Sequence, residues 1–255
     1  MKRSEIENFL TSTLKPELFD DYCPNGLQVE GKTEIKNVLF ALSATKESAQ
    51  YAVKIKADAM IVHHGLFWKF HGVRTITGTF YHRIAPLIKN DINLIGYHLP
   101  LDGHIEFGNA ASLAKEIGMT DISPFGEYKK AFTGVKGKLA NPISGIEFKN
   151  HLEKVLNHQI LYSNPIESNK PIQSIGIITG GANSQWIEAY KLGLDAYITG
   201  EMSEHDWHES REAGIHMYAG GHHSTERLGI IALMNKMKNQ FPELEVSYFE
   251  SDNPA

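Results

Sequence analysis

Two adjacent histidines, His63 and His64, close a short apolar run over residues 59–62. The run is typical of a buried strand, and ligands in open α/β sheets bind just beyond the carboxyl ends of strands. Because side chains alternate along an extended backbone, the two imidazoles reach in different directions, which suits two metal ions better than one ion held by both. An arbitrary pair of histidines is more often satisfied by ordinary hydrogen bonds, so the pair alone does not decide between these interpretations.

Two later clusters of ligand-type residues, His98-x-x-x-Asp102 and His222-x-x-x-Glu226, each follow an apolar run. At the start of a helix, His222 and Glu226 project from one face because they are four residues apart. Imidazoles combined with carboxylates and no thiols favour zinc, iron, manganese, cobalt or nickel over calcium or magnesium. Asp102 and Glu226 are candidate bridges between two metals, and metals about 3.5–4 Å apart hold a water between them and make hydroxide available near neutral pH.

The elements that position these clusters alternate between apolar runs and amphipathic stretches, which predicts an α/β protein. Capping boxes at Ser4-x-x-Glu7 and Ser144-x-x-Glu147 predict two helix starts, and Pro24-Asn25-Gly26 predicts a loop. Strands are predicted over 38–42, 59–62, 92–97, 132–139, 174–179, 196–199, 215–219 and 244–249. Helices are predicted over 45–56, 79–89, 144–156, 183–192 and 203–213, and from residue 226 to about 239.

The two halves of the chain echo one another. The segment 58–62, Asp-Ala-Met-Ile-Val, resembles 195–199, Asp-Ala-Tyr-Ile-Thr, and this alignment places His64 opposite Glu201. One strand later, the two His-x-x-x-carboxylate clusters also correspond. We therefore predict two interlinked, similar α/β lobes with the metal cleft between them. Their bounds are 1–125, carrying His63, His64 and Asp102, and 126–255, carrying His222 and Glu226.

The overall composition is that of an ordinary globular protein, with 42% hydrophobic and 22% charged residues. A net charge of -5 gives no electrostatic reason to expect binding to nucleic acid or to a membrane. The single cysteine, Cys23, excludes an intrachain disulfide and fits a reducing compartment. The N-terminus lacks the apolar core of a signal peptide, and no apolar run is long enough to cross a bilayer. We expect a cytoplasmic protein.

Five motifs together resemble one known family, the NIF-three-like proteins, which are also called dinuclear-metal-centre hexameric proteins or homologues of type 2 GTP cyclohydrolase I. The similarity covers nearly the whole chain, and the motifs stand in the family's order. They are Val62-His63-His64-Gly65-Leu66-Phe67-Trp68, Tyr97-His98-x-x-Leu101-Asp102, Gly108-Asn109, Thr199-Gly200-Glu201 and Gly221-His222-x-x-x-Glu226.

The resemblance implies two divalent transition-metal ions per subunit and a toroidal homohexamer whose metal sites face an internal cavity. Some relatives insert an extra domain mid-chain, and 255 residues leave no room for it, so the short form is expected. The metal ligands implied by the family pattern are His63, His64, Asp102, His222 and Glu226.

Neighbouring residues are expected to play supporting roles. His98 is a candidate to orient Asp102 by an outer hydrogen bond, as metal-ligating groups usually require. Glu201 is the candidate for an acid/base residue that binds no metal, although a carboxylate in such a place can equally be structural. Phe67 and Trp68 are predicted to pack or to line the cavity, not to stack on a substrate.

The reaction stays open between three interpretations. A metal-dependent hydrolase would use bridged hydroxide on a small-molecule substrate, and the family name points to GTP cyclohydrolase chemistry, in which the purine ring opens at C8 and formate leaves. The usual zinc cyclohydrolases rely on cysteine ligands, however, and Cys23 lies outside every ligand cluster. A nucleotide phosphoesterase uses the same metal pair. A ring-shaped metal-binding scaffold without turnover is the alternative from another class, and open coordination positions favour an enzyme over it.

Overall fold

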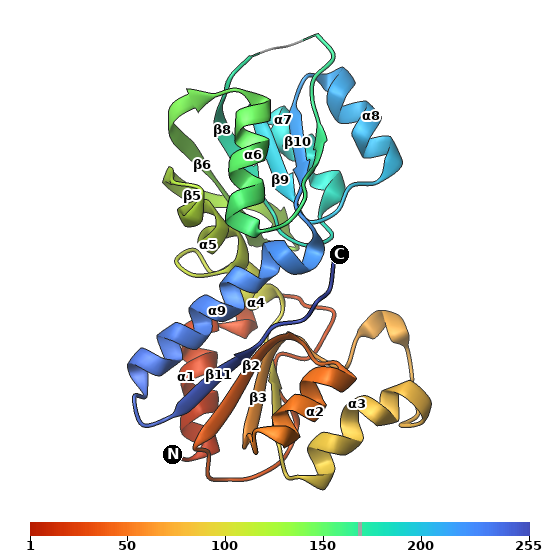
Figure 1. Cartoon of the computed structure of the whole chain (residues 1–255), viewed down its shortest axis with the longest axis vertical. Coiled ribbons are helices and arrows are strands. Elements are labelled where there is room, and N and C mark those ends of the chain that lie inside the picture. Colours follow the sequence, from red (N-terminus) through yellow and green to blue (C-terminus); the bar gives the residue numbers. More distant parts are fainter. Residues whose placement is uncertain (168–169) are drawn as a thin grey trace. The chain divides into compact units, whose positions relative to one another are not determined.

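The structure is a computed structural model that describes residues 1–167 and 170–255. It divides into two compact units, each built on its own β-sheet (Figure 1). The first unit contains Met1–Leu101 and Ile230–Ser251, and the second contains Asp102–Gly229 and Asp252–Ala255. These bounds differ from the predicted lobes 1–125 and 126–255, because the strand that begins at Met119 pairs within the second sheet and the last strand pairs within the first.

The sheet of the first unit has the order β1-β4-β3-β2-β11. All neighbours run parallel except β1, which pairs antiparallel with β4. The carboxyl ends of β2, β3 and β4 therefore meet at one edge, where His64 pairs in register with Ser43. The strands are β1 (Gly26–Val29), β2 (Asn37–Ser43), β3 (Ala59–His64), β4 (Asn93–Gly96) and β11 (Glu245–Phe249).

Helices cover both faces of this first sheet (Figure 1). On one face, Leu39 and Met60 pack against Ala49 of α2 and Ile84 of α3 in a single apolar cluster. Because side chains alternate along β2, Phe40 points to the other face, where α1 and the C-terminal part of α9 lie. The helices are α1 (Arg3–Leu14), η1 (Pro16–Leu18), α2 (Lys46–Lys54), η2 (Lys69–His71), α3 (Gly78–Lys89), α4 (Leu99–Asp102) and α9 (His222–Gln240).

The second unit contains a six-stranded sheet of order β5-β6-β8-β9-β10-β7. Strands β8, β9 and β10 are parallel, whereas β5, β6 and β7 pair antiparallel with their neighbours. The three parallel strands again bring their carboxyl ends to one edge. The strands are β5 (Met119–Tyr128), β6 (Ala131–Ile143), β7 (Leu161–Ser163), β8 (Ile172–Ile177), β9 (Ala196–Thr199) and β10 (His216–Ala219).

Helices also sandwich the second sheet (Figure 1). Leu113 of α5 and Phe148 of α6 pack with Ile175 and Ile198 on one face. On the other face, Tyr197 packs in a cluster with Trp186 and Ala189 of α7. The helices are α5 (Asn109–Glu116), α6 (Gly145–Leu156), η3 (Asn183–Gln185), α7 (Trp186–Lys191) and α8 (Glu204–Ala213), with the N-terminal part of α9.

The two units share an arrangement of three central parallel strands, which confirms the predicted pair of similar α/β lobes. Strand β9 lies between β8 and β10 as β3 lies between β2 and β4. Before β3, the Asp58 carboxylate accepts backbone N–H bonds from Lys36 and Asn37 and pairs with Lys32 at 2.6 Å.

Asp195, before β9, repeats the arrangement of Asp58. Its carboxylate accepts the backbone N–H groups of Gln173 and Ser174 and pairs with Lys170 at 2.5 Å. In both units the pKa of the aspartate is lowered, because hydrogen bonds to the ionised form outweigh the opposing effect of burial.

Two local predictions were wrong. Helix α1 begins at Arg3, so Ser4 lies inside it, and the Glu5 carboxylate accepts from the Lys2 N–H instead of forming the predicted box. The loop predicted at Gly26 opens into strand β1. The box at Ser144 is confirmed at the start of α6.

In the part of the chain that the structure describes, no helix combines the length and the apolar character that crossing a membrane requires.

Candidate metal centre

Three imidazoles gather at the carboxyl edge of the first sheet. His63 and His64 are the last two residues of β3, and His98 follows β4. One ring nitrogen of each lies within 4.8 Å of those of the other two. The ring centroids of His63 and His64 are 4.5 Å apart, and that of His98 is 5.0 Å from His63. The strand ends thus bring together three histidines of the first half of the chain.

Outer hydrogen bonds orient the two adjacent histidines. His63 Nδ1 lies 3.1 Å from the Tyr97 carbonyl oxygen, and because a carbonyl can only accept, Nδ1 carries the proton. His63 Nε2 is then the nitrogen with a lone pair, which is the form that binds a metal. His64 Nδ1 lies 3.0 Å from Ser43 Oγ, which belongs to β2, whereas Tyr97 follows β4 on the other side of β3. The two imidazoles are therefore held from different sides.

His98 is held by a buried carboxylate. Its Nδ1 donates to Asp21 Oδ1 at 3.0 Å, and both side chains are less than 10% exposed. The Asp21 carboxylate also accepts from the N–H groups of Tyr22 and Leu99 and from the Asn25 amide. Burial alone would raise the pKa of Asp21, but these hydrogen bonds and His98 lower it to about 2. The predicted contact of His98 with Asp102 stays a prediction.

In the second unit, two buried carboxylates lie close together. Asp102 is 6% exposed and Glu226 is 3% exposed, and one carboxylate oxygen of each lies within 4.8 Å of the other. Asn109 Nδ2 donates to Asp102 at 2.7 Å, and Thr179 Oγ1 lies 3.5 Å from the same oxygen. Two neighbouring buried anions repel each other unless a cation compensates their charge.

His222 lies between two carboxylates at the start of α9. Its Nδ1 bonds to Glu201 Oε1 at 2.5 Å, and its Nε2 lies 3.3 Å from Glu226 Oε2. Burial would lower the pKa of His222, but Glu226 and Glu201 outweigh it and raise the pKa to about 10. Without a metal, the protonated ring supplies the positive charge beside these two carboxylates. A metal ion bound at Nε2 would supply that charge instead.

Glu201 has a defined contact in this arrangement. A carboxylate on the far nitrogen of a ligating histidine fixes the ring and strengthens it as a ligand. Glu201 is placed in this way, because its carboxylate bonds to His222 Nδ1. The Glu201 side chain is 53% exposed. The acid/base role predicted for Glu201 stays a prediction.

Glycines let the backbone after β8 and β9 approach the His222 and Glu226 residues closely. A Cβ at Gly200 would lie 2.7 Å from the Gly180 carbonyl oxygen and 2.7 Å from the Cα of His222. Gly180 has a φ of +67°, and a Cβ there would clash with the Glu226 carboxylate. The strand ends after β8 and β9 therefore accommodate only glycine beside these ligands.

Sequence reasoning found the ligand-type residues but missed most of their partners. Asn109 belongs to a quoted motif, so the sequence marks it as a residue of interest. An isolated serine or aspartate, or a backbone carbonyl, is not marked by any sequence pattern. The missed partners are Asp21, Ser43, Thr179 and the backbone carbonyl of Tyr97, a residue that itself stands in a quoted motif.

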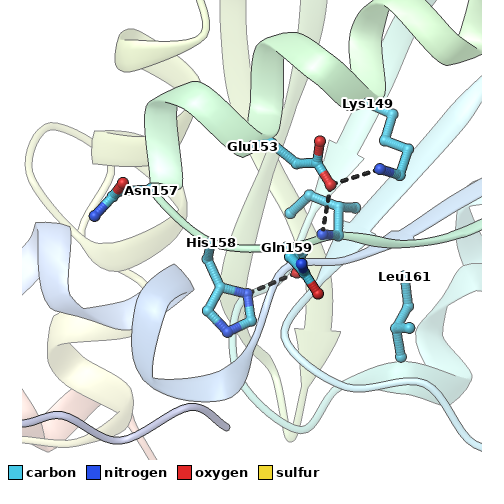
Figure 2. A pocket seen from close by; sticks show the side chains of 7 residues that line it. Lys149, Glu153, Asn157, His158, Gln159 and Leu161 are labelled. Atoms are coloured by element: carbon cyan, nitrogen blue, oxygen red, sulfur yellow. Dashed lines mark hydrogen bonds and ion pairs between the residues drawn. The ribbon is translucent and has the colours of Figure 1, made fainter.

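A separate depression of about 520 Å³ lies at the C-terminal end of α6 (Figure 2). Its charged groups are engaged with one another, since Lys149 pairs with Glu153 at 2.5 Å and the Ile160 N–H donates to the same carboxylate. His158 bonds the Gln159 carbonyl oxygen. The lining spans residues 149–161, outside the predicted ligand set, so we place the candidate chemistry at the strand ends instead.

The fold and these clusters define the class of protein. It consists of two similar α/β units and carries groups of histidines and carboxylates that could hold a metal ion. The chain belongs to the Duf34/NIF3 (NGG1p interacting factor 3) family, whose model matches residues 1–254. It is 43% identical over 256 residues to the "GTP cyclohydrolase 1 type 2 homolog" of Haemophilus influenzae, with both chains covered completely.

Solved structures agree with this assignment. The fold matches that of the protein ybgI, described as of unknown function, with a TM-score of 0.89 and 40% identity over the whole of both chains. It also matches TTHA1606 from Thermus thermophilus, with a TM-score of 0.89 and 28% identity over the whole of both chains.

Proposed function

We propose that this protein binds two divalent transition-metal ions and uses them as a hydrolase. The observation that carries the proposal is that the histidines and Asp102 are oriented by hydrogen bonds from neighbouring residues, as the ligands of a metal site usually are. Zinc, iron, manganese, cobalt and nickel suit this donor set. The proposed ligands are His63, His64, Asp102, His222 and Glu226.

The chain's own residues would prepare the site before any ion binds. The Tyr97 carbonyl fixes the proton of His63 on Nδ1, and the Ser43 hydroxyl orients the ring of His64 through its Nδ1. Asn109 holds one Asp102 oxygen, and Glu201 holds the ring of His222. When bound, paired divalent ions supply Lewis acidity and activate water near neutral pH.

The names of the relatives suggest the reaction. "GTP cyclohydrolase 1 type 2 homolog" favours attack at a purine ring carbon and release of formate. The alternative enzyme is a nucleotide phosphoesterase, which requires the same metal chemistry. The alternative from another class is a metal-binding scaffold without turnover. For each of these we propose the cytoplasmic, toroidal homohexamer that the family resemblance implies.

A screen for turnover tests the proposal. Metal-loaded protein is incubated with nucleotides, phosphoesters and cyclic amides, and formate and phosphate are measured separately. We expect one product class to form with the wild type and to fall to background in the Asp102→Ala, Glu226→Ala double variant. The matched control is Glu17→Ala, Glu116→Ala, which removes two exposed carboxylates and should retain turnover.

Equal wild-type and double-variant rates would exclude the hydrolase and leave the scaffold. Formate release would select the cyclohydrolase, and phosphate release would select the phosphoesterase. The same samples test the assembly, because sedimentation of a 28.5 kDa monomer would contradict the hexamer.

A further inference from the structure

The first unit carries an aromatic surface beside its three histidines. Tyr22, Trp68 and Phe70, here called the aromatic platform, come from two loops that meet at the carboxyl edge of the sheet. We infer that the aromatic platform is a stacking site for the planar heteroaromatic ring of a small-molecule substrate. The inference rests on the proposed function for the chemistry that follows binding, but not for the binding itself.

The rings of the platform contact one another. Trp68 and Phe70 are stacked with centroids 5.4 Å apart and planes inclined by 23°. Tyr22 lies 5.9 Å from Trp68 and 6.1 Å from Phe70. Because Trp68 and Phe70 stack on each other, each leaves its outer face for a planar ligand, and aromatic faces of this kind are those on which bases stack.

Hydrogen bonds hold this surface from its base. Trp68 Nε1 donates to the Gly65 carbonyl oxygen at 3.2 Å. The Lys69 N–H donates to the Tyr22 carbonyl oxygen at 2.8 Å, and Lys69 Nζ donates to the Asp21 carbonyl oxygen. The two loops are therefore tied together where the rings emerge, so a ligand would not have to order them on binding.

The platform is open at its outer end. Phe70 is 67% exposed, and Val73 and Ile76 in the same segment are also exposed. The outer ring of the platform is therefore accessible to a ligand from solvent. Phe67 contrasts with Trp68, because Phe67 packs edge-on against Phe80 in the core.

Its inner end contacts the imidazoles of the candidate metal centre. Trp68 lies 5.0 Å from the His98 ring and 5.9 Å from the His64 ring. A ring stacked on Trp68 would thus have polar groups along its edge, which favours a heteroaromatic ring with nitrogen or oxygen atoms over a hydrocarbon. The prediction that Trp68 serves only packing or cavity lining is accordingly replaced here by a role in substrate binding.

Calorimetry with guanosine 5′-monophosphate tests the inference, with ribose 5-phosphate as the matched probe that lacks a ring. We expect the wild type to bind the nucleotide at least about five-fold more tightly than ribose 5-phosphate, because a stacked base contributes about that much or more. Trp68→Ala and Phe70→Ala should each weaken nucleotide binding about ten-fold and leave ribose 5-phosphate unchanged. Trp68→Phe, which keeps an aromatic ring, should retain most of the affinity.

Trp207→Ala is the control, since Trp207 is a part-exposed tryptophan on α8 outside the platform. Equal nucleotide affinity in the wild type and in Trp68→Ala would overturn the inference, as would a wild type that does not prefer the nucleotide. A change in sedimentation of Trp68→Ala with unchanged nucleotide affinity would assign the platform to contact between copies of the chain and would also overturn it.

The titrations are run on chelator-treated and on metal-loaded protein, which separates this inference from the proposed function. Ring-dependent binding without turnover would retain the stacking site and reject the hydrolase. Turnover that does not respond to Trp68→Ala or Phe70→Ala would retain the hydrolase and reject the stacking site.

Discussion

Replacing Glu226 with glutamine is expected to lower the affinity for divalent metal by more than about 100-fold. Loss of an outer hydrogen bond alone costs about 10–100-fold, and this change removes a proposed ligand itself. Glu226 is 3% exposed, lies beside Asp102, and contacts His222 Nε2. The amide keeps the shape of the side chain but not its charge, so the proposed site would lose one of its negative charges.

Metal titration of Glu226→Gln, with circular dichroism to verify folding, measures this effect. Glu243→Gln is the matched control because Glu243 is exposed. Turnover should disappear together with the metal. A folded Glu226→Gln protein that binds metal as tightly as the wild type would remove Glu226 from the proposed ligand set.

The second large effect is expected at the repeated aspartates. Asp58→Asn and Asp195→Asn should each lower the free energy of unfolding at pH 7 by about 1–3 kcal/mol, since each change removes a charged acceptor from two backbone N–H groups. The same carboxylates pair with Lys32 and Lys170, whose exposure limits the contribution of the ion pairs.

The pH dependence of this effect has a definite sign. The pKa of each carboxyl is lowered below 3.8 in the folded protein, so its contribution is present above the unfolded pKa of about 3.9 and is lost as the pH falls through the folded pKa. The difference between wild type and variant should therefore shrink below about pH 4. Urea unfolding at several pH values measures it.

Asp121→Asn is the control for this series, because Asp121 is exposed and its φ of +53° is one that asparagine tolerates. We expect it to change stability by less than about 0.5 kcal/mol. A constant difference between Asp195→Asn and the wild type from pH 3 to pH 7 would contradict the role assigned to the ionised carboxylate.

Local patterns predicted much of the fold. Apolar runs located the parallel strands. The echo between 58–62 and 195–199 predicted the two similar units, which the matching order of the three central parallel strands confirms. Ligand-type residues were recognisable because they stand directly after apolar runs. His63 and His64 at the end of β3 are the clearest case, and the structure adds His98 beside them.

The rest depends on contacts between residues distant in sequence. Asp21 reaches His98 across 77 positions, and nothing in the loop before Cys23 marks it as a partner. Strands β1 and β7 are too short to show a period, and each is defined by antiparallel pairing at the edge of a sheet. The unit bounds also follow from pairing, because β11 returns to β2 after the chain has built the second sheet.

The central claim is that this chain binds a pair of metal ions. Elemental analysis of purified protein, saturated with metal and freed of unbound ions, tests it most directly. We predict two divalent transition-metal ions per 28.5 kDa chain. One ion or fewer per chain would contradict the claim.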